Sequence, residues 1–241
     1  MCPKLLVVLV SAGMVVGLCA ALAPATIINP NDDTYIDRQN LDTTPNDTFV
    51  CTQSKPGAQA NGKGRAYKQT FMEFTLGTAL AASATFKIVC QTAFVGLDGV
   101  VYGKQFQFDG AGKPDPITWR KKWGPWTAFD PDTINPFTQV DTGWTDLGAL
   151  IGNNILLYNL GSTTGEHTFD LTAFYNAHRG QTITIAFWGT NPINDNAVKW
   201  YSSRNTAGQH APQIDWTPVP EPATLTVLSL LTMAMLRRRS R

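Results

Sequence analysis

The most regular alternation of apolar and polar side chains in this chain is Ala84-Thr85-Phe86-Lys87-Ile88-Val89-Cys90-Gln91-Thr92-Ala93. On an extended backbone, Phe86, Ile88 and Cys90 fall on one side and Lys87 falls on the other. Alternation with a period of two residues is typical of a half-buried β-strand. The pattern therefore predicts a strand that turns one face to a core and the other to water or a ligand.

Short strands separated by turns make up the rest of the middle of the chain. Thr182–Trp188 repeats the period-two pattern, whereas residues 29–33 have the composition of a turn and residues 54–65 that of an exposed loop. The other expected elements are strands at residues 26–28, 34–36, 49–51, 69–76, 100–108, 144–147, 155–158, 167–172, 198–201 and 213–216, and one or two helical turns within 172–178. So many short strands without a long amphipathic helix predict an all-β sandwich, most closely a jelly roll.

The first 25 residues have the layout of a secretory signal peptide. Lys4 precedes an apolar helix-forming run from Leu5 to Ala23, and Ala23-Pro24-Ala25 offers small residues for cleavage before Thr26. Cys19 raises the alternative of a lipoprotein, but Leu18 before it is too large for the usual lipoprotein motif. We therefore expect an exported protein whose main domain spans residues 26–218, enough for a sizeable core.

Residues 219–241 have three parts in a fixed order. Pro220, Glu221 and Pro222 come first, an uncharged apolar run of fourteen residues, Ala223–Leu236, follows, and Arg237–Arg241 closes the segment. As a helix the apolar run would be roughly 21 Å long, which is short of the ~30 Å hydrocarbon core of a bilayer. A short membrane anchor or a frayed apolar tail is one interpretation.

This order of parts resembles the PEP-CTERM sorting signal of Gram-negative bacteria. The resemblance rests on Pro220-Glu221-Pro222, the short apolar helix and the arginine cluster. It implies handling by an exosortase-type sorting machinery after transient insertion into the membrane. The expected destination is the cell envelope, the cell surface or the extracellular matrix.

The charge of the middle domain differs from that of the whole chain. Of nineteen Lys and Arg and eighteen Asp and Glu residues, five cations and one acid lie in the two ends, which leaves fourteen cations and seventeen acids. A mildly acidic domain argues against a nucleic-acid partner, for which a basic face is expected.

Two of the four cysteines, Cys51 and Cys90, lie in the middle domain. An exported protein meets an oxidising compartment, so we expect a disulfide between them. Two buried free thiols are the alternative, because cysteine also behaves as a small hydrophobic residue.

Several segments of the middle domain, taken together, resemble the DNRLRE-type domain. They are Phe71–Leu76, Ile117–Trp119, Phe169–Thr172, Tyr201–Asn205 and Ala211–Ile214, in the order of that family. Glu73, Thr75 and Asn205 differ from the residues usual in the family. The resemblance implies a jelly-roll module of the kind appended to polysaccharide-degrading enzymes, some of which bind acidic polysaccharides such as alginate.

The sequence offers little support for catalysis. Motifs of the Gly-x-Ser-x-Gly or His-Glu-x-x-His type are missing, and His167, His178 and His210 are scattered. A glycosidase needs only two carboxylates, so a secreted hydrolase or lyase stays open as an alternative. We expect a non-catalytic protein.

The best candidate for binding is a stretch rich in cations and tryptophan. Trp123 and Trp126 could stack on sugar rings, and Arg120, Lys121 and Lys122 could donate hydrogen bonds to carboxylates or sulfates. The alternative is that the tryptophans fill the core while the cations form a solvated strand edge.

We expect no cofactor. Asp32, Asp33 and Asp37 could hold a structural Ca²⁺, although turn-forming acids without a metal are the simpler interpretation. A polysaccharide-binding surface protein is thus the favoured function. A structural surface protein without a specific ligand is the runner-up, ahead of a hydrolase.

Overall fold

The computed structural model describes residues 25–37, 42, 44–54, 67–93, 99–118, 145–146, 164–189, 198–205 and 211–219. The expected signal peptide, the sorting signal with Pro220, Glu221 and Pro222, and the strand at 155–158 lie outside these residues. The same holds for the candidate binding stretch Arg120–Trp126. No helix among the described residues is long and apolar enough to span a bilayer.

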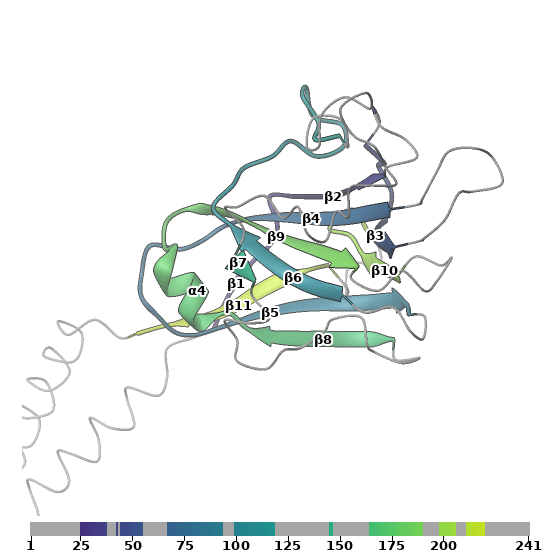
Figure 1. Cartoon of the computed structure of the whole chain (residues 1–241). Helices are drawn as coiled ribbons and strands as arrows, with labels where there is room; N and C mark the ends of the chain where they lie inside the picture. Colours follow the sequence, from purple (N-terminus) through teal and green to yellow (C-terminus); the bar gives the residue numbers. More distant parts are fainter. Residues whose placement is uncertain are drawn as a thin grey trace, which may run out of the picture.

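The described residues fold into two antiparallel sheets in a sandwich-like arrangement, with one sheet curled into half a barrel (Figure 1). The first sheet contains β1 (Thr26–Ile28), β3 (Phe49–Ser54), β5 (Ala81–Thr92), β8 (Gly165–Asp170), β10 (Val198–Tyr201) and β11 (Gln213–Pro218). The second contains β2 (Asp32–Asp37), β4 (Tyr67–Thr75), β6 (Gly99–Lys104), β7 (Thr145–Asp146) and β9 (Thr182–Gly189). The expected all-β class is confirmed.

Strand β3 joins the two sheets. Residues 49–52 pair with β10 in the first sheet, and Gln53 and Ser54 pair with β4 in the second. Nine of the described strands therefore form one continuous path across both layers, and β2 and β8 pair with β4 and β5 beside it.

Strand β5 confirms the prediction made from its alternating pattern and starts three residues earlier than the stretch Ala84–Ala93. It pairs with β8 along one edge, and with β11 and then β10 along the other. Phe86, Ile88 and Cys90 are buried, whereas Lys87 on the opposite face is partly exposed. The first sheet is thus built around this strand.

The main core lies between the two sheets and is rich in aromatic rings. Phe86 of β5 packs edge-on against Phe74 of β4, with 5.9 Å between ring centroids, and Trp200 of β10 lies 5.3 Å from Phe187 of β9. All four side chains are buried. Full burial of a side chain of this size stabilises the fold by about 1.5–3 kcal/mol, so these contacts hold the sheets together.

The outer face of the second sheet is buried as well. Phe71 of β4 and Thr184 and Ala186 of β9 are on that face and are inaccessible to solvent. The segment 105–118, which follows β6, covers them: Phe108 lies 6.1 Å from Phe71, and the Thr184 hydroxyl donates to the Phe106 carbonyl oxygen at 2.6 Å. In Figure 1 this teal segment crosses above β2 and β4. Strand β4 is therefore buried on both faces.

The expected helical turns after β8 are confirmed as α4 (Thr172–Ala177). The Asn176 side chain donates to the Ala81 carbonyl oxygen and accepts from the Ala81 amide, both at 2.9 Å. The helix is thus fastened to the first residue of β5. The strand expected over 100–108 ends at Lys104, because from Phe106 onward the chain turns over the second sheet.

Candidate functional site

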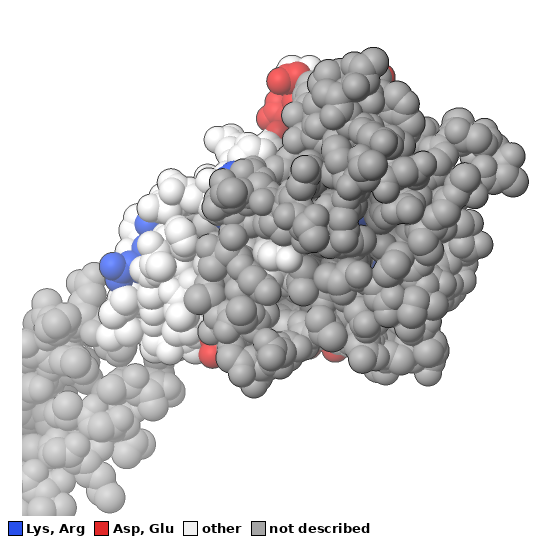
Figure 2. Space-filling view, in the orientation of Figure 1, with Lys and Arg blue, Asp and Glu red and all other residues white. Residues whose placement is uncertain are grey.

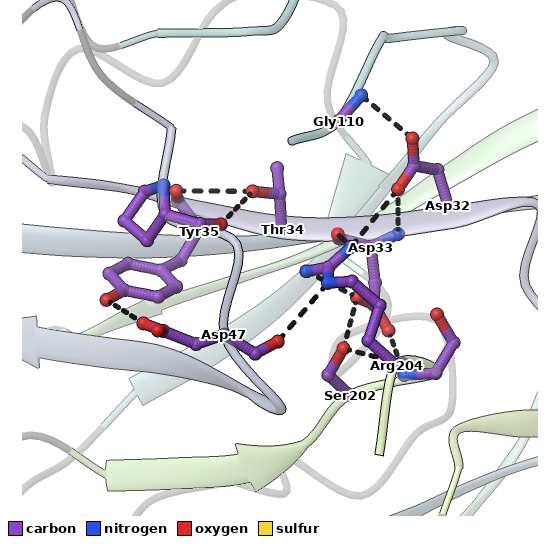
Figure 3. A network of polar contacts seen from close by, with 10 residues as sticks. Asp32, Asp33, Thr34, Tyr35, Asp47, Gly110, Ser202 and Arg204 are labelled. Atoms are coloured by element: carbon purple, nitrogen blue, oxygen red, sulfur yellow. Dashed lines mark hydrogen bonds and ion pairs between the residues drawn. The ribbon is translucent and has the colours of Figure 1, made fainter. Parts of the chain in front are cut away.

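A cluster of buried acids and one arginine lies where β2 meets three loops (Figure 3). The sequence predicted a turn over residues 29–33, but Asp32 and Asp33 belong to β2, and all six residues of this strand are buried. Asp32 is 8% exposed, Asp33 0% and Glu73 of β4 4%. An unpaired buried charge is costly, so the structure must supply donors to each of these carboxylates.

Asp32 and Glu73 are opposite each other in the pairing of β2 with β4, on the outer face of the second sheet. Asp32 Oδ2 accepts a hydrogen bond from the Gly110 amide at 2.9 Å. Glu73 Oε2 accepts one from the Phe108 amide at 2.9 Å, and its Oε1 accepts one from Asn31 Nδ2 at 3.0 Å. Two carboxylates therefore fasten the covering segment 105–118 to the sheet.

Asp33 points to the opposite side of β2, because successive side chains alternate across a strand. Its Oδ1 accepts from the Ser202 hydroxyl at 2.7 Å, and its Oδ2 accepts from the Ser203 amide. Ser202 and Ser203 directly follow β10 of the first sheet. Asp33 therefore ties the second sheet to a loop of the first.

Arg204 lies between the two aspartates. Its guanidinium is 3.0 Å from Asp33 Oδ1 and 3.4 Å from Asp32 Oδ1, and it also donates to the Asp33 carbonyl oxygen. Its Nε donates to the carbonyl oxygen of Asp47 at 3.2 Å, which adds the loop before β3. Five donors in a rigid planar fork suit arginine to such a multiple contact.

The Asp47 carboxylate accepts a hydrogen bond from the Tyr35 hydroxyl at 2.8 Å. Burial, followed by this hydrogen bond, raises the pKa of Tyr35 well above its usual range. The phenol therefore stays protonated and acts as a donor that extends the cluster along β2.

Gly110 is required where the covering segment meets the cluster. A Cβ atom at this position would lie 2.3 Å from Asp32 Oδ1, closer than any real contact. Only glycine lets the backbone amide approach the carboxylate so closely. Asp32 is 78 residues from Gly110 in the sequence, so no local pattern could show this contact.

The cluster holds several segments of the chain together through hydrogen bonds to its carboxylates. Hydrogen bonds to charged groups contribute about 1.5–3 kcal/mol each, and both oxygens of Asp32, Asp33 and Glu73 accept at least one. These acceptors are thus occupied by donors of the same chain. The cluster joins β2, β4 and the segments around residues 47, 110 and 203.

The three aspartates considered as possible calcium ligands, Asp32, Asp33 and Asp37, do not converge. Asp33 and Asp37 lie on one face of β2 and Asp32 on the other. Arg204 pairs with Asp32 and Asp33, and the Lys68 ammonium is 3.7 Å from Asp37. Within the described ranges no group of three or more His, Cys, Asp or Glu side chains is placed to hold a metal ion.

The expected disulfide between Cys51 and Cys90 is corrected by the structure, in which both are buried free thiols. Cys51 is on β3 and Cys90 is on β5, and β10 runs between these strands. Two strand spacings separate the residues by about 9–10 Å, beyond the ~7 Å that a bridge can span between Cα atoms. Burial raises the pKa of each thiol to about 11.

The two described histidines lie apart. His167 on β8 has its ring 6.0 Å from that of Trp200, and desolvation lowers its pKa. His178 follows α4, where its Nδ1 is 3.1 Å from Gln181 Oε1. His210 lies outside the described residues. The structure thus brings neither described histidine to the buried acids.

The candidate binding stretch Arg120–Trp126 starts just after a fixed point of the structure. Ile117 and Thr118 are buried at the end of the covering segment. The Ile117 amide donates to the Asp109 carbonyl oxygen at 2.6 Å, and the Thr44 hydroxyl donates to the Ile117 carbonyl oxygen. The chain is therefore held two residues before Arg120.

The fold and the cluster together define an all-β, sandwich-like domain whose loops are fastened by buried ion pairs. Comparisons with models of known families and with curated proteins found no match to this chain.

Proposed function

We propose that this chain is an exported, non-catalytic polysaccharide-binding protein with a jelly-roll domain of the DNRLRE type at residues 26–218. A signal peptide at 1–25 directs export, and a PEP-CTERM signal at 219–241 directs sorting by an exosortase-type machinery. Its destination is the cell envelope, the surface or the extracellular matrix. Its partners are that machinery, the membrane during sorting, and an acidic polysaccharide.

The observation that carries the proposal is the fixed position of the chain before the candidate stretch. Asp32 and Glu73 fasten the segment 105–118, and Thr118 is buried two residues before Arg120. Fixing one end of a binding segment lowers the entropy lost when it orders on a ligand. A costly buried cluster directly before a cationic and aromatic stretch is consistent with a scaffold that presents a binding segment.

The proposed recognition combines two kinds of contact. Trp123 and Trp126 would stack on sugar rings, and Arg120, Lys121 and Lys122 would donate to uronic-acid carboxylates. Because the middle domain is acidic overall, a polyanion would bind where cations are gathered locally, and residues 120–122 are three consecutive cations.

The test is retention on an alginate gel. We expect the wild type to be retained at low salt and released earlier as salt rises, because ions screen exposed charges within about 8–10 Å. Lys121→Ala with Lys122→Ala should weaken retention on alginate and leave a neutral glucan column unaffected. Lys113→Ala is the matched control, because Lys113 is an exposed cation of the neighbouring covering segment.

Unchanged retention of the Lys121→Ala, Lys122→Ala protein would contradict the assigned site. A wild type that is not retained at all would favour the second candidate, a structural surface protein. The specific observation behind that candidate is the cluster itself, whose acids bind donors of their own chain.

A further inference from the structure

Three large apolar side chains are exposed in the part of the chain that the structure describes. Ile27 is 55% exposed, Leu80 45% and Val219 40%. Singly exposed apolar residues are normal on a protein surface. Leu80 and Val219, however, lie together at one end of the first sheet, whereas Ile27 is on β1 opposite Asp215.

The pairing of strands shows which parts of the chain meet at this end. Strand β1 runs antiparallel to β11, with Thr26 opposite Trp216, so residue 25 and residue 217 lie side by side. Pro218 at the end of β11 is opposite Ala81 at the start of β5, and the Val219 amide donates to the Leu80 carbonyl oxygen at 2.7 Å. Both ends of the described chain therefore leave from this end of the sheet (Figure 1).

A cation lies in a turn next to this end of the sheet. The turn that contains Arg179 is joined to the turn before β5 by a hydrogen bond from the Gly180 amide to the Gly77 carbonyl oxygen at 2.9 Å. Arg179 is exposed. Figure 2 shows Lys and Arg atoms on the surface on this side of the molecule. We call Leu80, Val219 and Arg179 the terminal rim.

The distance from the rim to the apolar run is fixed by chain length. Four residue steps lead from Val219 to Ala223, where the uncharged run of the sorting signal begins. Even a fully extended backbone covers only about 14 Å in four steps. A bilayer that holds the apolar run therefore lies within that distance of Val219, whose amide is hydrogen-bonded to Leu80.

We propose that the terminal rim rests on the surface of a phospholipid bilayer while the run Ala223–Leu236 is inserted. This inference rests on the sorting step of the proposed function. Apolar side chains are stabilised when they leave water for the boundary between headgroups and acyl chains, and a cation at the same depth pairs with anionic headgroups. The terminal rim has both apolar side chains and a cation. It also lies where the short connection to Ala223 places the membrane surface.

The experiment uses the full chain with Cys2→Ser and Cys19→Ser, mixed with vesicles of phosphatidylglycerol and phosphatidylcholine. Leu80→Cys carries an environment-sensitive fluorophore. Cys51 and Cys90 do not compete at neutral pH, because they are buried and burial raises the pKa of each to about 11. Thr168→Cys is the control, since Thr168 is exposed and its partner Lys87 lies seven residues along the chain from Leu80, about 23 Å away.

We expect the label at position 80 to shift to the blue and to be shielded several-fold from an aqueous quencher when vesicles are added. The label at position 168 should change in neither respect. Flotation with the vesicles but no shift at position 80 overturns the inference and leaves membrane insertion intact. Equal shifts at both positions also overturn it, and a chain that does not float with vesicles overturns the proposed insertion together with the inference.

Discussion

Strands β2 and β8 are each six residues long and carry acidic residues, yet the acids are buried in β2 and exposed in β8. Every residue of β2 is buried, and its aspartates accept hydrogen bonds from loops. In β8 burial alternates, and Glu166 and Asp170 are exposed. In the described part, β2 is paired with β4 alone and β8 with β5 alone. The same residue type thus serves as an anchor in one strand and as a solvated surface in the other.

The difference shows that an acidic side chain can be buried where hydrogen-bond donors from other segments contact its carboxylate. Arg204, Ser202 and Gly110 supply donors to β2 from far along the sequence. The acidic side chains of β8, Glu166 and Asp170, remain exposed to solvent. Charged side chains on an exposed strand such as β8 discourage pairing with another molecule. Burial of β2 and exposed charge on β8 are thus two ways to protect a strand at the side of a sheet.

The largest effect should come from removing the buried anchor. Asp33→Ala leaves Arg204 without its nearest carboxylate and Ser202 and Ser203 without their acceptor, so we expect a loss of about 3–5 kcal/mol in the free energy of unfolding. Equilibrium unfolding of Asp33→Ala and the wild type in urea measures this loss in the free energy of unfolding.

The matched control is the exposed aspartate of β8. Asp170 Oδ1 accepts from the Thr172 amide at 2.9 Å, and Asp170→Ala should cost about 1 kcal/mol, as for an exposed cap. Equal losses for the two variants would remove the contrast between the strands.

A smaller effect is expected at Gly110. A Cβ atom there would meet the Asp32 carboxylate, so Gly110→Ala should break the bond to Asp32 and cost about 1–3 kcal/mol. Because the clash is with Asp32, the substitution should cost less when Asp32 is also alanine. A double-mutant cycle in urea tests this, and strictly additive losses would show that the strain arises elsewhere.

The smallest effect concerns pH and the inner face of β8. Desolvation lowers the pKa of His167 below its ordinary value of 6.5, so the unfolded chain binds the proton more readily than the folded one. Its contribution to stability is complete above pH 6.5 and is lost as the pH falls from there through the lowered pKa. Thermal unfolding at several pH values should show a steeper decline for the wild type than for His167→Gln. Parallel declines would exclude His167 as the cause.

The sequence predicted β5 and β4 as strands, but it showed the surroundings of the two faces only for β5. The alternation around Phe86 and Ile88 was sufficient to identify β5, because one face is in the core and the other is solvated. It could not show that β4 is buried on both faces, since the covering segment lies far from β4 in sequence. Local pattern therefore identified strands but not layers.

The buried cluster escaped prediction for a related reason. Asp32 and Asp33 have turn-forming composition, and their partners Gly110, Ser202 and Arg204 are 78, 169 and 172 residues away. Ser202 and Arg204 stood in a segment that resembles the DNRLRE pattern, which was the available signal. The pairing of Cys51 with Cys90 was expected from the compartment alone, and the strand between them could not be foreseen. The assignment of Arg120–Trp126 stays a prediction.

The pairing of β1 with β11 also has a consequence for the time course of folding. Thr26 and Trp216 are neighbours although about 190 residues separate them, and closing so long a loop is entropically costly. Contacts of such high sequence separation slow folding. Strand β11 lies between β1 and β5, and among the described strands it is the one that pairs with β1 and the last in sequence, so in a chain made from its N-terminus β1 waits for β11. The moment at which the first sheet closes is therefore set by its last-made strand.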